Sequence, residues 1–212
     1  MVKRIQIILF SLLFSLAGFS QSRFSVNLNG GIDKNYNKYY SPNGYTKFED
    51  AKTDYNYGLD LGYRLSDWLR ARVELRFNEY SFGQKPLSTV EILQTEFTLN
   101  TMAFVPRIDF RLVNVGKFEL FVSPGIRFEY VTNANQESLR SDGEISDRNY
   151  ISTSYNDGMS GFAGGAILKY NINKHLGLTL NSDYTLFFDK LYEKNDAAMQ
   201  RLSGGLGVEW TF

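Results

Sequence analysis

The chain alternates apolar and polar residues over segments of roughly ten residues, and such segments recur from Phe24 to the last residue. The final segment shows the pattern clearly, with apolar or aromatic residues at 202, 206, 208, 210 and 212 and small or polar residues between them. A period of two is typical of a β-strand that has one apolar and one polar face. The pattern therefore predicts an all-β protein.

Eight strands follow from this pattern. We expect them at residues 24–32, 55–65, 69–82, 95–112, 117–131, 159–170, 176–188 and in a last segment that ends at 212. The connections are alternately short turns (66–68, 113–116 and 171–175) and long polar segments (33–54, 83–94, 132–158 and 189–198). An even strand number with this alternation predicts an eight-stranded antiparallel up-and-down transmembrane β-barrel.

The fourth expected strand changes parity near Pro106. The apolar residues taken to face outward are Phe97, Leu99, Thr101 and Ala103 before the proline, and Ile108, Phe110 and Leu112 after it. Proline lacks the backbone donor of a ladder hydrogen bond, so a β-bulge at Pro106 is the expected cause.

The first twenty residues have the pattern of a cleaved signal peptide. Lys3 and Arg4 precede an apolar run from Ile5 to Ala17, and a small-x-small site, Gly18-Phe19-Ser20, follows. The apolar run is shorter than the roughly twenty residues that a membrane-spanning helix needs. We expect cleavage after Ser20, which leaves residues 21–212 as one outer-membrane β-barrel domain.

The chain ends on an aromatic residue, Phe212, with Trp210 and Val208 before it at two-residue spacing. This ending resembles the signal that the outer-membrane barrel-insertion machinery reads during assembly. It predicts a location in the outer membrane of a Gram-negative bacterium. Short turns belong to the periplasmic side of such barrels, so both termini are expected there and the long segments are expected outside the cell.

The amino-acid composition helps to decide which partners and which class of β-barrel are consistent with the chain. The chain has no cysteine, and removal of Lys3 and Arg4 leaves 21 basic against 23 acidic residues. This weak acidity argues against nucleic acid as a partner. A soluble lipocalin-type barrel is the alternative class. The aromatic ending, the alternation of long and short connections and the 14 Tyr and 17 Phe, which suit interfacial girdles, favour the membrane barrel.

The polar faces of the expected strands carry charged residues of both signs. An eight-stranded barrel is just wide enough for side chains to fill, so a salt-bridge network is favoured over an ion pathway. The expected lumen network consists of Asp60, Arg64, Arg72, Glu74, Arg76, Arg107, Asp109, Arg111, Glu119, Arg127, Glu129, Asp183 and Glu209, together with Arg70 and Lys169.

The sequence offers few residues that could carry catalysis or bind a metal ion. His175 is the only histidine and falls in a short turn, so no Ser-His or Cys-His pair and no zinc cluster can be built. Acidic residues in the third long segment do not fit the spacing of a calcium loop, and we expect them to be solvated. These residues are Glu137, Asp142, Glu144 and Asp147. The chain is therefore expected to be non-enzymatic and without a cofactor.

Several segments of the second half carry a family resemblance. They are 121–128 (FVSPGIRF), 161–170 (GFAGGAILKY), 178–184 (LTLNSDY) and the C-terminal strand. They resemble the small outer-membrane β-barrel domain of OmpX/OmpA-type proteins, and especially its PorT-like branch. The resemblance implies an eight-stranded barrel in the outer membrane. One member of the branch is associated with a protein-secretion system.

The leading functional hypothesis places the activity in the extracellular loops, in adhesion, recognition or envelope structure. The aromatic residues of the first loop are equally consistent with a binding surface and with strand extension at the headgroup level. They are Tyr36, Tyr39, Tyr40, Tyr45 and Phe48. The alternatives are a narrow pore and an accessory barrel of a secretion system. The expected partners are outer-membrane lipid and lipopolysaccharide, the insertion machinery and an unidentified loop ligand, and the barrel is expected to be a monomer.

Overall fold

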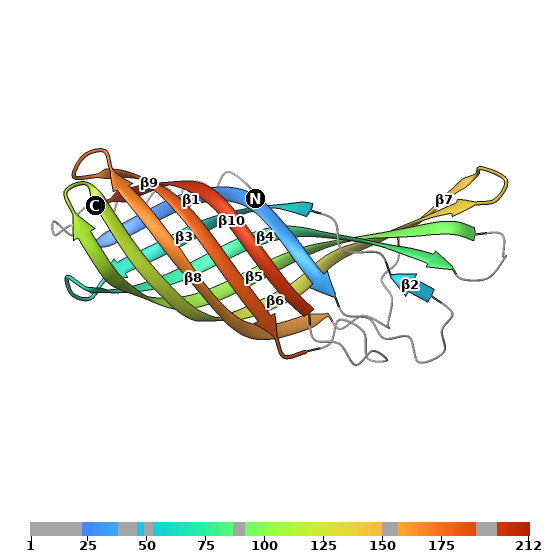
Figure 1. The fold of residues 1–212 in the computed structure, drawn as a ribbon, viewed down its shortest axis with the longest axis horizontal. Coiled ribbons are helices and arrows are strands. Elements are labelled where there is room, and N and C mark those ends of the chain that lie inside the picture. Colours follow the sequence, from blue (N-terminus) through green and yellow to red (C-terminus); the bar gives the residue numbers. More distant parts are fainter. Residues whose placement is uncertain (1–22, 38–45, 49–52, 87–91, 150–156, 190–198) are drawn as a thin grey trace, which may run out of the picture.

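The computed structural model describes residues 23–37, 46–48, 53–86, 92–149, 157–189 and 199–212. Within them the chain forms ten strands, shown in Figure 1. They are β1 (Phe24–Asn37), β2 (Thr46–Phe48), β3 (Thr53–Arg64), β4 (Leu69–Pro86), β5 (Ile92–Val115), β6 (Phe118–Arg140), β7 (Ile145–Asn149), β8 (Gly158–Asn171), β9 (Leu176–Phe187) and β10 (Met199–Thr211). No helix in these ranges is long and apolar enough to cross a membrane. The expected signal peptide lies outside the described residues.

Eight of these strands close into an antiparallel barrel. Their order around the ring is β4, β3, β1, β10, β9, β8, β6 and β5, and pairing between β4 and β5 completes it. The first and last barrel strands form the seam, from Ser25 opposite Thr211 to Asn37 opposite Met199. Closure leaves no wall strand with an unpaired edge, which a sheet in lipid requires. The expected eight-stranded antiparallel barrel is confirmed.

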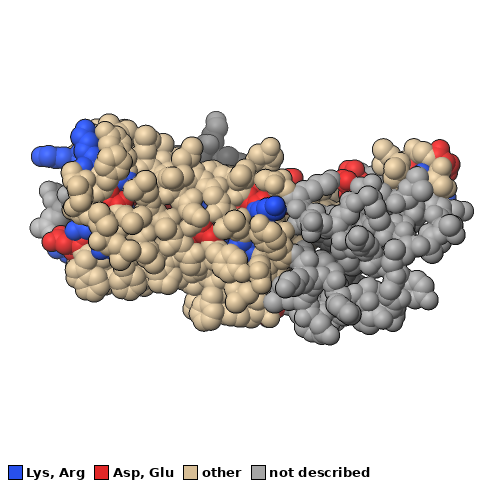
Figure 2. Space-filling view, viewed as in Figure 1, with Lys and Arg blue, Asp and Glu red and all other residues tan. Residues whose placement is uncertain are grey.

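Alternate residues of the wall point outward, and those residues are mostly apolar. On β6, Val122, Ile126, Phe128 and Tyr130 are exposed, whereas Ser123, Arg127 and Glu129 between them are buried. The other wall strands alternate in the same way, and on β5 Ile108, Phe110 and Leu112 are exposed as expected. Figure 2 shows that uncharged side chains cover most of the wall in this view. A wall of this kind is suited to lipid on its outer face.

Aromatic pairs form a belt at each end of the wall. Phe24 with Tyr63, Trp68 with Phe110 and Phe118 with Tyr170 lie near the short turns, with ring centroids 4.8, 6.2 and 5.0 Å apart. Tyr57 with Phe77 and Phe162 with Phe188 lie near the other end, at 5.3 and 4.8 Å. Tyrosine and tryptophan favour the membrane–water interface. The two belts therefore indicate where the wall meets the headgroups.

β5 has no bulge at Pro106, so that expectation was wrong. Its register with β4 runs without a shift through Val73 opposite Pro106. Shifts in its pairing with β6 lie instead between Asn100 and Thr101 and between Arg111 and Val113. The residues with inward-facing, buried side chains are Phe97, Leu99, Thr101, Ala103 and Val105, which include the four taken as outward. The parity assignment failed because the upper lumen is itself apolar, so apolar side chains there do not mark the lipid face.

Three strands, β4, β5 and β6, continue beyond the wall, and β4 contains 18 residues. β5 and β6 contain 24 and 23 residues, whereas β1, β3, β8, β9 and β10 contain 12 to 14. β6 runs to Arg140 and turns into β7, which pairs with it from Asn135 opposite Asn149 to Leu139 opposite Ile145. We call this unit, residues 132–149, the projecting hairpin; it extends to the right in Figure 1. Nine residues beyond Val131 reach about 30 Å along the strand.

Two segments that we expected to be loops, 83–94 and 132–158, are partly β-strand in the structure, so that expectation was wrong. β4 continues to Pro86, β5 begins at Ile92, and much of the third segment is strand. Outside the membrane both faces of a sheet contact water, so an extended hairpin needs no alternation of apolar and polar residues. The period-two pattern therefore disappears from the sequence while the strand pairing continues.

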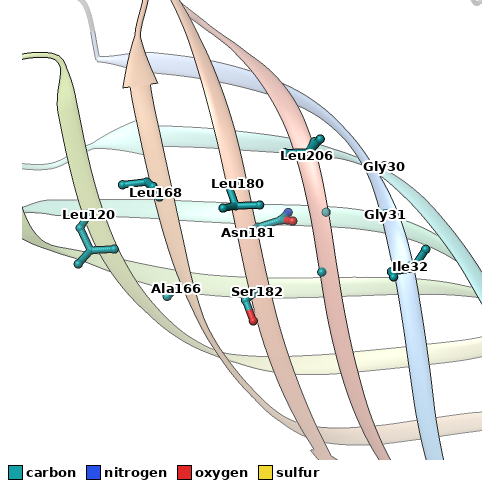
Figure 3. A pocket seen from close by; sticks show the side chains of 12 residues that line it. Gly30, Gly31, Ile32, Leu120, Ala166, Leu168, Leu180, Asn181, Ser182 and Leu206 are labelled. Atoms are coloured by element: carbon teal, nitrogen blue, oxygen red, sulfur yellow. The ribbon is translucent and has the colours of Figure 1, made fainter. Parts of the chain in front are cut away.

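Close backbone contact at the seam leaves no room for a side chain at Gly31. Figure 3 shows Gly30 and Gly31 on β1 beside Leu206 of β10, at a groove of about 590 Å³ in the outer wall. A Cβ atom on Gly31 would lie 2.1 Å from the carbonyl oxygen of Gly204, whereas one on Gly30 would meet nothing nearer than 3.7 Å. Only the first addition forces the two backbones apart.

We therefore expect Gly31→Ala to destabilise the barrel by about 1–3 kcal/mol, the usual range for overpacking. Gly30→Ala on the same strand is the matched control and should leave stability nearly unchanged. Urea unfolding, followed by the mobility difference between folded and boiled protein on gels, measures both. Equal midpoints for the two variants would refute the close-contact explanation.

Candidate functional site

The lumen near the short turns holds carboxylates between basic side chains. Arg70 lies between Asp109 and Glu209, with 2.7 Å from its Nε and Nη1 to an oxygen of each. Lys169 donates a hydrogen bond to the other oxygen of Glu209. All four side chains are buried, so each charge is compensated inside the protein rather than by water.

Glu74 lies in the middle of the lumen among three arginines. Its Oε1 accepts a hydrogen bond from Arg72 and lies 2.8 Å from Nε of Arg107, and its Oε2 accepts from Nε of Arg76 at 3.1 Å. Arg72 and Arg107 are directly opposite each other on β4 and β5, a position in which like charges repel. The carboxylate of Glu74 between them offsets this repulsion.

Arg72 connects the middle layer to the lower one. Besides Glu74, its Nε lies 2.9 Å from Asp109 and its Nη1 lies 3.3 Å from Asp60. Its Nη2 donates to the hydroxyl of Ser123 at 2.7 Å. A single buried guanidinium thus contacts three carboxylates, which makes Arg72 the most highly connected cation of the network.

Glu129 is the central acceptor of the upper layer. Arg201 donates to both of its oxygens, at 2.7 and 3.0 Å, in a bidentate pair. The hydroxyl of Thr101 donates to it at 2.7 Å, and Arg127 donates through Nε. Arg201 also donates to Oδ1 of Asn35 at 2.7 Å. The two ends of the chain are therefore joined through the lumen as well as along the seam.

An apolar cluster, the apolar cap, lies above the charged layers at the end away from the short turns. It consists of Tyr80, Phe97, Leu99, Ala134, Met159, Phe187 and Met199, with Val131 packed against it. The guanidinium carbon of Arg201 lies 5.5 Å from the centre of the Phe187 ring, which joins the cap to the charged layer below. Apolar side chains that fill a barrel in this way exclude water and therefore ions.

The structure brings fourteen of the fifteen expected lumen residues into ion pairs, and Arg64 is the exception. The fourteen are Asp60, Arg70, Arg72, Glu74, Arg76, Arg107, Asp109, Arg111, Glu119, Arg127, Glu129, Lys169, Asp183 and Glu209. Arg64 faces the lumen at its short-turn mouth, where it is only half-buried and forms no ion pair with another described residue.

Three buried charged residues were missed. Asp33 and Asp54 lie in a segment taken as a loop, and Arg201 lies at the start of the last strand. Arg201 has the same parity as Ser203 and Glu209, both of which are buried, so its position relative to them could have identified it. With these three and the partly exposed Arg64 and Arg111, the described lumen holds nine basic and nine acidic side chains.

The candidates for catalysis and metal binding remain apart. His175 is exposed in the turn between β8 and β9, where its Nδ1 lies 2.9 Å from the carbonyl oxygen of Thr211. Among the described residues no three His, Cys, Asp or Glu side chains are grouped to hold a metal ion. Of the acidic residues considered for calcium, Asp142 accepts a hydrogen bond from the backbone N–H of Glu144 at 3.0 Å and so shapes the turn.

The projecting hairpin exposes an apolar pair at its tip. Leu139 and Ile145 are opposite each other, and their exposed fractions are 38% and 70%. This part of the chain lies beyond the aromatic belts, so we expect water rather than lipid around it. Of the first-loop aromatics, Tyr36 is exposed on β1 beneath the ammonium of Lys34, 5.6 Å from its ring centre. Tyr39, Tyr40 and Tyr45 lie outside the described residues, and Phe48 belongs to the short strand β2.

The expected assembly signal lies on the outer face of β10. Trp210 and Phe212 are exposed, Val208 is partly buried, and Trp210 stands between Val26 of β1 and Leu176 of β9. We expect Trp210→Ala combined with Phe212→Ala to reduce the amount of folded barrel in the outer membrane several-fold, because the insertion machinery would lose its contact residues. Leu206→Ala on the same face is the matched control.

Immunoblots of heat-modifiable protein in outer-membrane fractions measure this effect, and periplasmic degradation products should increase in parallel. A normal level of folded barrel from the double variant would show that these aromatics are not an assembly signal.

A family model fits the chain over nearly its whole length. The model of the outer membrane protein beta-barrel domain matches residues 7–212. The chain belongs to this family. It is thus an outer-membrane β-barrel, in agreement with the closed wall and the apolar outer face described above. The more specific PorT-like branch stays a prediction.

Solved structures of small outer-membrane barrels are similar to this family member. OprG of Pseudomonas aeruginosa has a TM-score of 0.58 at 12% identity, over 91% of this chain and 97% of that one. Neisserial surface protein A gives 0.49 at 13%, over 89% and 97%. Ail, the attachment invasion locus protein of Yersinia pestis, gives 0.45 at 17%, over 90% and 99%. No curated protein matches the sequence significantly. At these identities the likeness to OprG shows the fold alone.

Proposed function

We propose that this outer-membrane barrel is a non-enzymatic surface protein that acts through its projecting hairpin, in adhesion or recognition. The observation that carries the proposal is the continuation of β5 and β6 beyond the wall, ending in the exposed pair Leu139 and Ile145. Leu139 and Ile145 are paired with each other across the hairpin, yet 38% and 70% of these apolar side chains stay exposed. They are suited to contact another molecule.

The contents of the lumen support a structural rather than a transporting role for the wall. The exposed fractions of Glu74, Asp109, Glu129 and Arg201 are all 0%, so water does not reach them in this conformation. A water-filled channel would leave such charges hydrated. The charged layers and the apolar cap therefore favour a rigid support for the hairpin over the narrow pore.

The orientation belongs to the same proposal. The short turns, the start of β1 and the C-terminal end of β10 lie at one end of the barrel and the projecting hairpin at the other, as Figure 1 shows. Outer-membrane barrels have their short turns in the periplasm. We therefore place the hairpin outside the cell, where adhesion partners are found.

The proposal is tested by adhesion of cells. Cells that display the wild-type barrel are compared with cells that display a barrel with a shortened hairpin, on immobilised bacterial cells, on extracellular matrix and on glass. Protease treatment of intact cells first verifies that the hairpin is exposed. The proposal requires that at least one surface binds wild-type cells more strongly, and it fails if all three bind both cell types equally.

A further inference from the structure

The short-turn mouth of the lumen is a basic pocket. It has a volume of about 570 Å³. Five of its lining residues are cationic and one is acidic. The cations are Arg64, Arg111, Lys117, Lys169 and Lys174, and the carboxylate is Glu119. This excess contrasts with the lumen as a whole, in which the described charges balance.

Two of the five cations are already neutralised. Arg111 donates to Glu119 at 2.9 Å, and Lys169 donates to Glu209 and lies 3.9 Å from Glu119. These side chains form the floor of the pocket, and the buried layer of Arg70 and Asp109 closes it from below. A ligand would therefore dock in the mouth without passing through the barrel.

Of the other three cations, Lys117 and Lys174 have no acidic partner among the described residues. Arg64 forms no ion pair, although its charge acts on the nearby carboxylate of Glu119. Arg64 faces the lumen at the end of β3, and Lys117 and Lys174 lie on two neighbouring turns of the rim. Lys117 also lies 5.7 Å from the ring centre of Tyr170, a contact that leaves its charge uncompensated. Figure 2 shows Lys and Arg atoms at this end of the molecule, with Asp or Glu atoms beside some of them.

The position and the lining of the pocket define the ligand. The inward-facing Arg64, Arg111 and Glu119 direct the pocket along the barrel axis, so its occupant comes from the aqueous phase and not from the bilayer. Its volume is within the range of ligand clefts and exceeds what a single oxyanion fills. Asn114 also lines it and offers an amide group to a peptide backbone, whereas Asn171 is already hydrogen-bonded to Glu119 and Asn173 accepts the backbone N–H groups of the β8–β9 turn.

We propose that the short-turn mouth binds an acidic peptide segment of a soluble protein, with Arg64, Lys117 and Lys174 as the cations that pair with its carboxylates. This goes beyond the role proposed for the projecting hairpin, which lies at the opposite end. The inference gives the barrel a second interaction surface, and in the proposed orientation that surface faces the periplasm.

The test measures binding of fluorescent hexaglutamate to the full barrel in nanodiscs of zwitterionic lipid, by fluorescence anisotropy. The wild type should bind hexaglutamate in preference to hexaglutamine, and binding should weaken as salt rises, because ions screen exposed charges. Lys117→Gln with Lys174→Gln should weaken binding about tenfold, since each exposed pair contributes modestly. Lys34→Gln removes one positive charge at the end of the barrel away from the pocket and is the control for Lys174→Gln alone. Binding should be weaker for Lys174→Gln than for Lys34→Gln.

Heat-modifiable mobility shows that each variant is folded, and Arg64→Gln is a second variant of the same pocket. Equal affinity for the two peptides, or unchanged binding by the double lysine variant, would overturn the proposal. So would loss of hexaglutamate binding in nanodiscs that contain phosphatidylglycerol, because a lipid headgroup would then occupy the site. None of these outcomes bears on the hairpin, so the two proposals fail separately.

Discussion

Arg72→Glu is expected to destabilise the barrel by about 3–5 kcal/mol or more, the range for breaking a buried ion pair. The wild-type guanidinium contacts three carboxylates, those of Asp60, Glu74 and Asp109. The substitution replaces the cation with a fourth carboxylate among them. The side chain of Arg72 is 4% exposed, so water cannot compensate the new charge.

Urea unfolding in lipid vesicles measures this loss. Lys34→Glu makes the same change of charge at an exposed site and should leave the midpoint nearly unchanged. Adding Glu74→Arg to Arg72→Glu restores the balance of signs and should recover part of the stability. If the buried and exposed reversals cost the same, the lumen charges are hydrated and the network does not stabilise the barrel.

Shortening the projecting hairpin should abolish binding to the partner surface while the barrel still folds. Replacing Leu139–Ile145 by Asn-Gly joins the paired residues Ser138 and Ser146 through a two-residue turn of the kind that hairpins favour. The replaced residues lie outside the wall and its lumen, so barrel stability should stay within about 0.5 kcal/mol. Cell adhesion and urea unfolding measure the two effects independently.

The apolar pair can be tested without shortening the strand. Leu139→Ser with Ile145→Ser should reduce adhesion as strongly as the shortened hairpin does. Val115→Ser, at an exposed apolar residue near the short turns, is the control and should change nothing. Full adhesion by the double serine variant would move the contact surface to other loops.

The alternation of apolar and polar residues was sufficient to predict the wall. Eight strands, their antiparallel order and most outward faces followed from residues such as Val122, Ile126 and Phe128, because lipid on one side and a filled lumen on the other impose a strict period of two. The same parity predicted which charged side chains share the lumen. Which cation contacts which carboxylate did not follow, since the strand tilt and register of a barrel set those contacts.

Two regions escaped the pattern for physical reasons. Phe97 and Leu99 point into the lumen, although their apolar character suggested the lipid face, because the apolar cap needs such residues inside. The hairpin beyond Val131 was taken as a loop because its sequence has no alternation of apolar and polar residues, even though Ala134 still packs into the apolar cap. Asp33 and Asp54 were missed with the segment in which they lie. In each case the assumption of a lipid face and a polar interior did not hold.

Conductance of the wild-type barrel in planar bilayers tests the closed lumen most directly. Nine basic and nine acidic side chains fill the described lumen, all but Arg64 and Asp54 in ion pairs, and an apolar cap closes it, so we expect no steady current above the bilayer background at either polarity. Insertion must be shown in parallel by heat-modifiable protein recovered from the same proteoliposomes. Reproducible single-channel steps of porin size from inserted barrel would contradict the account and assign the protein to the pores.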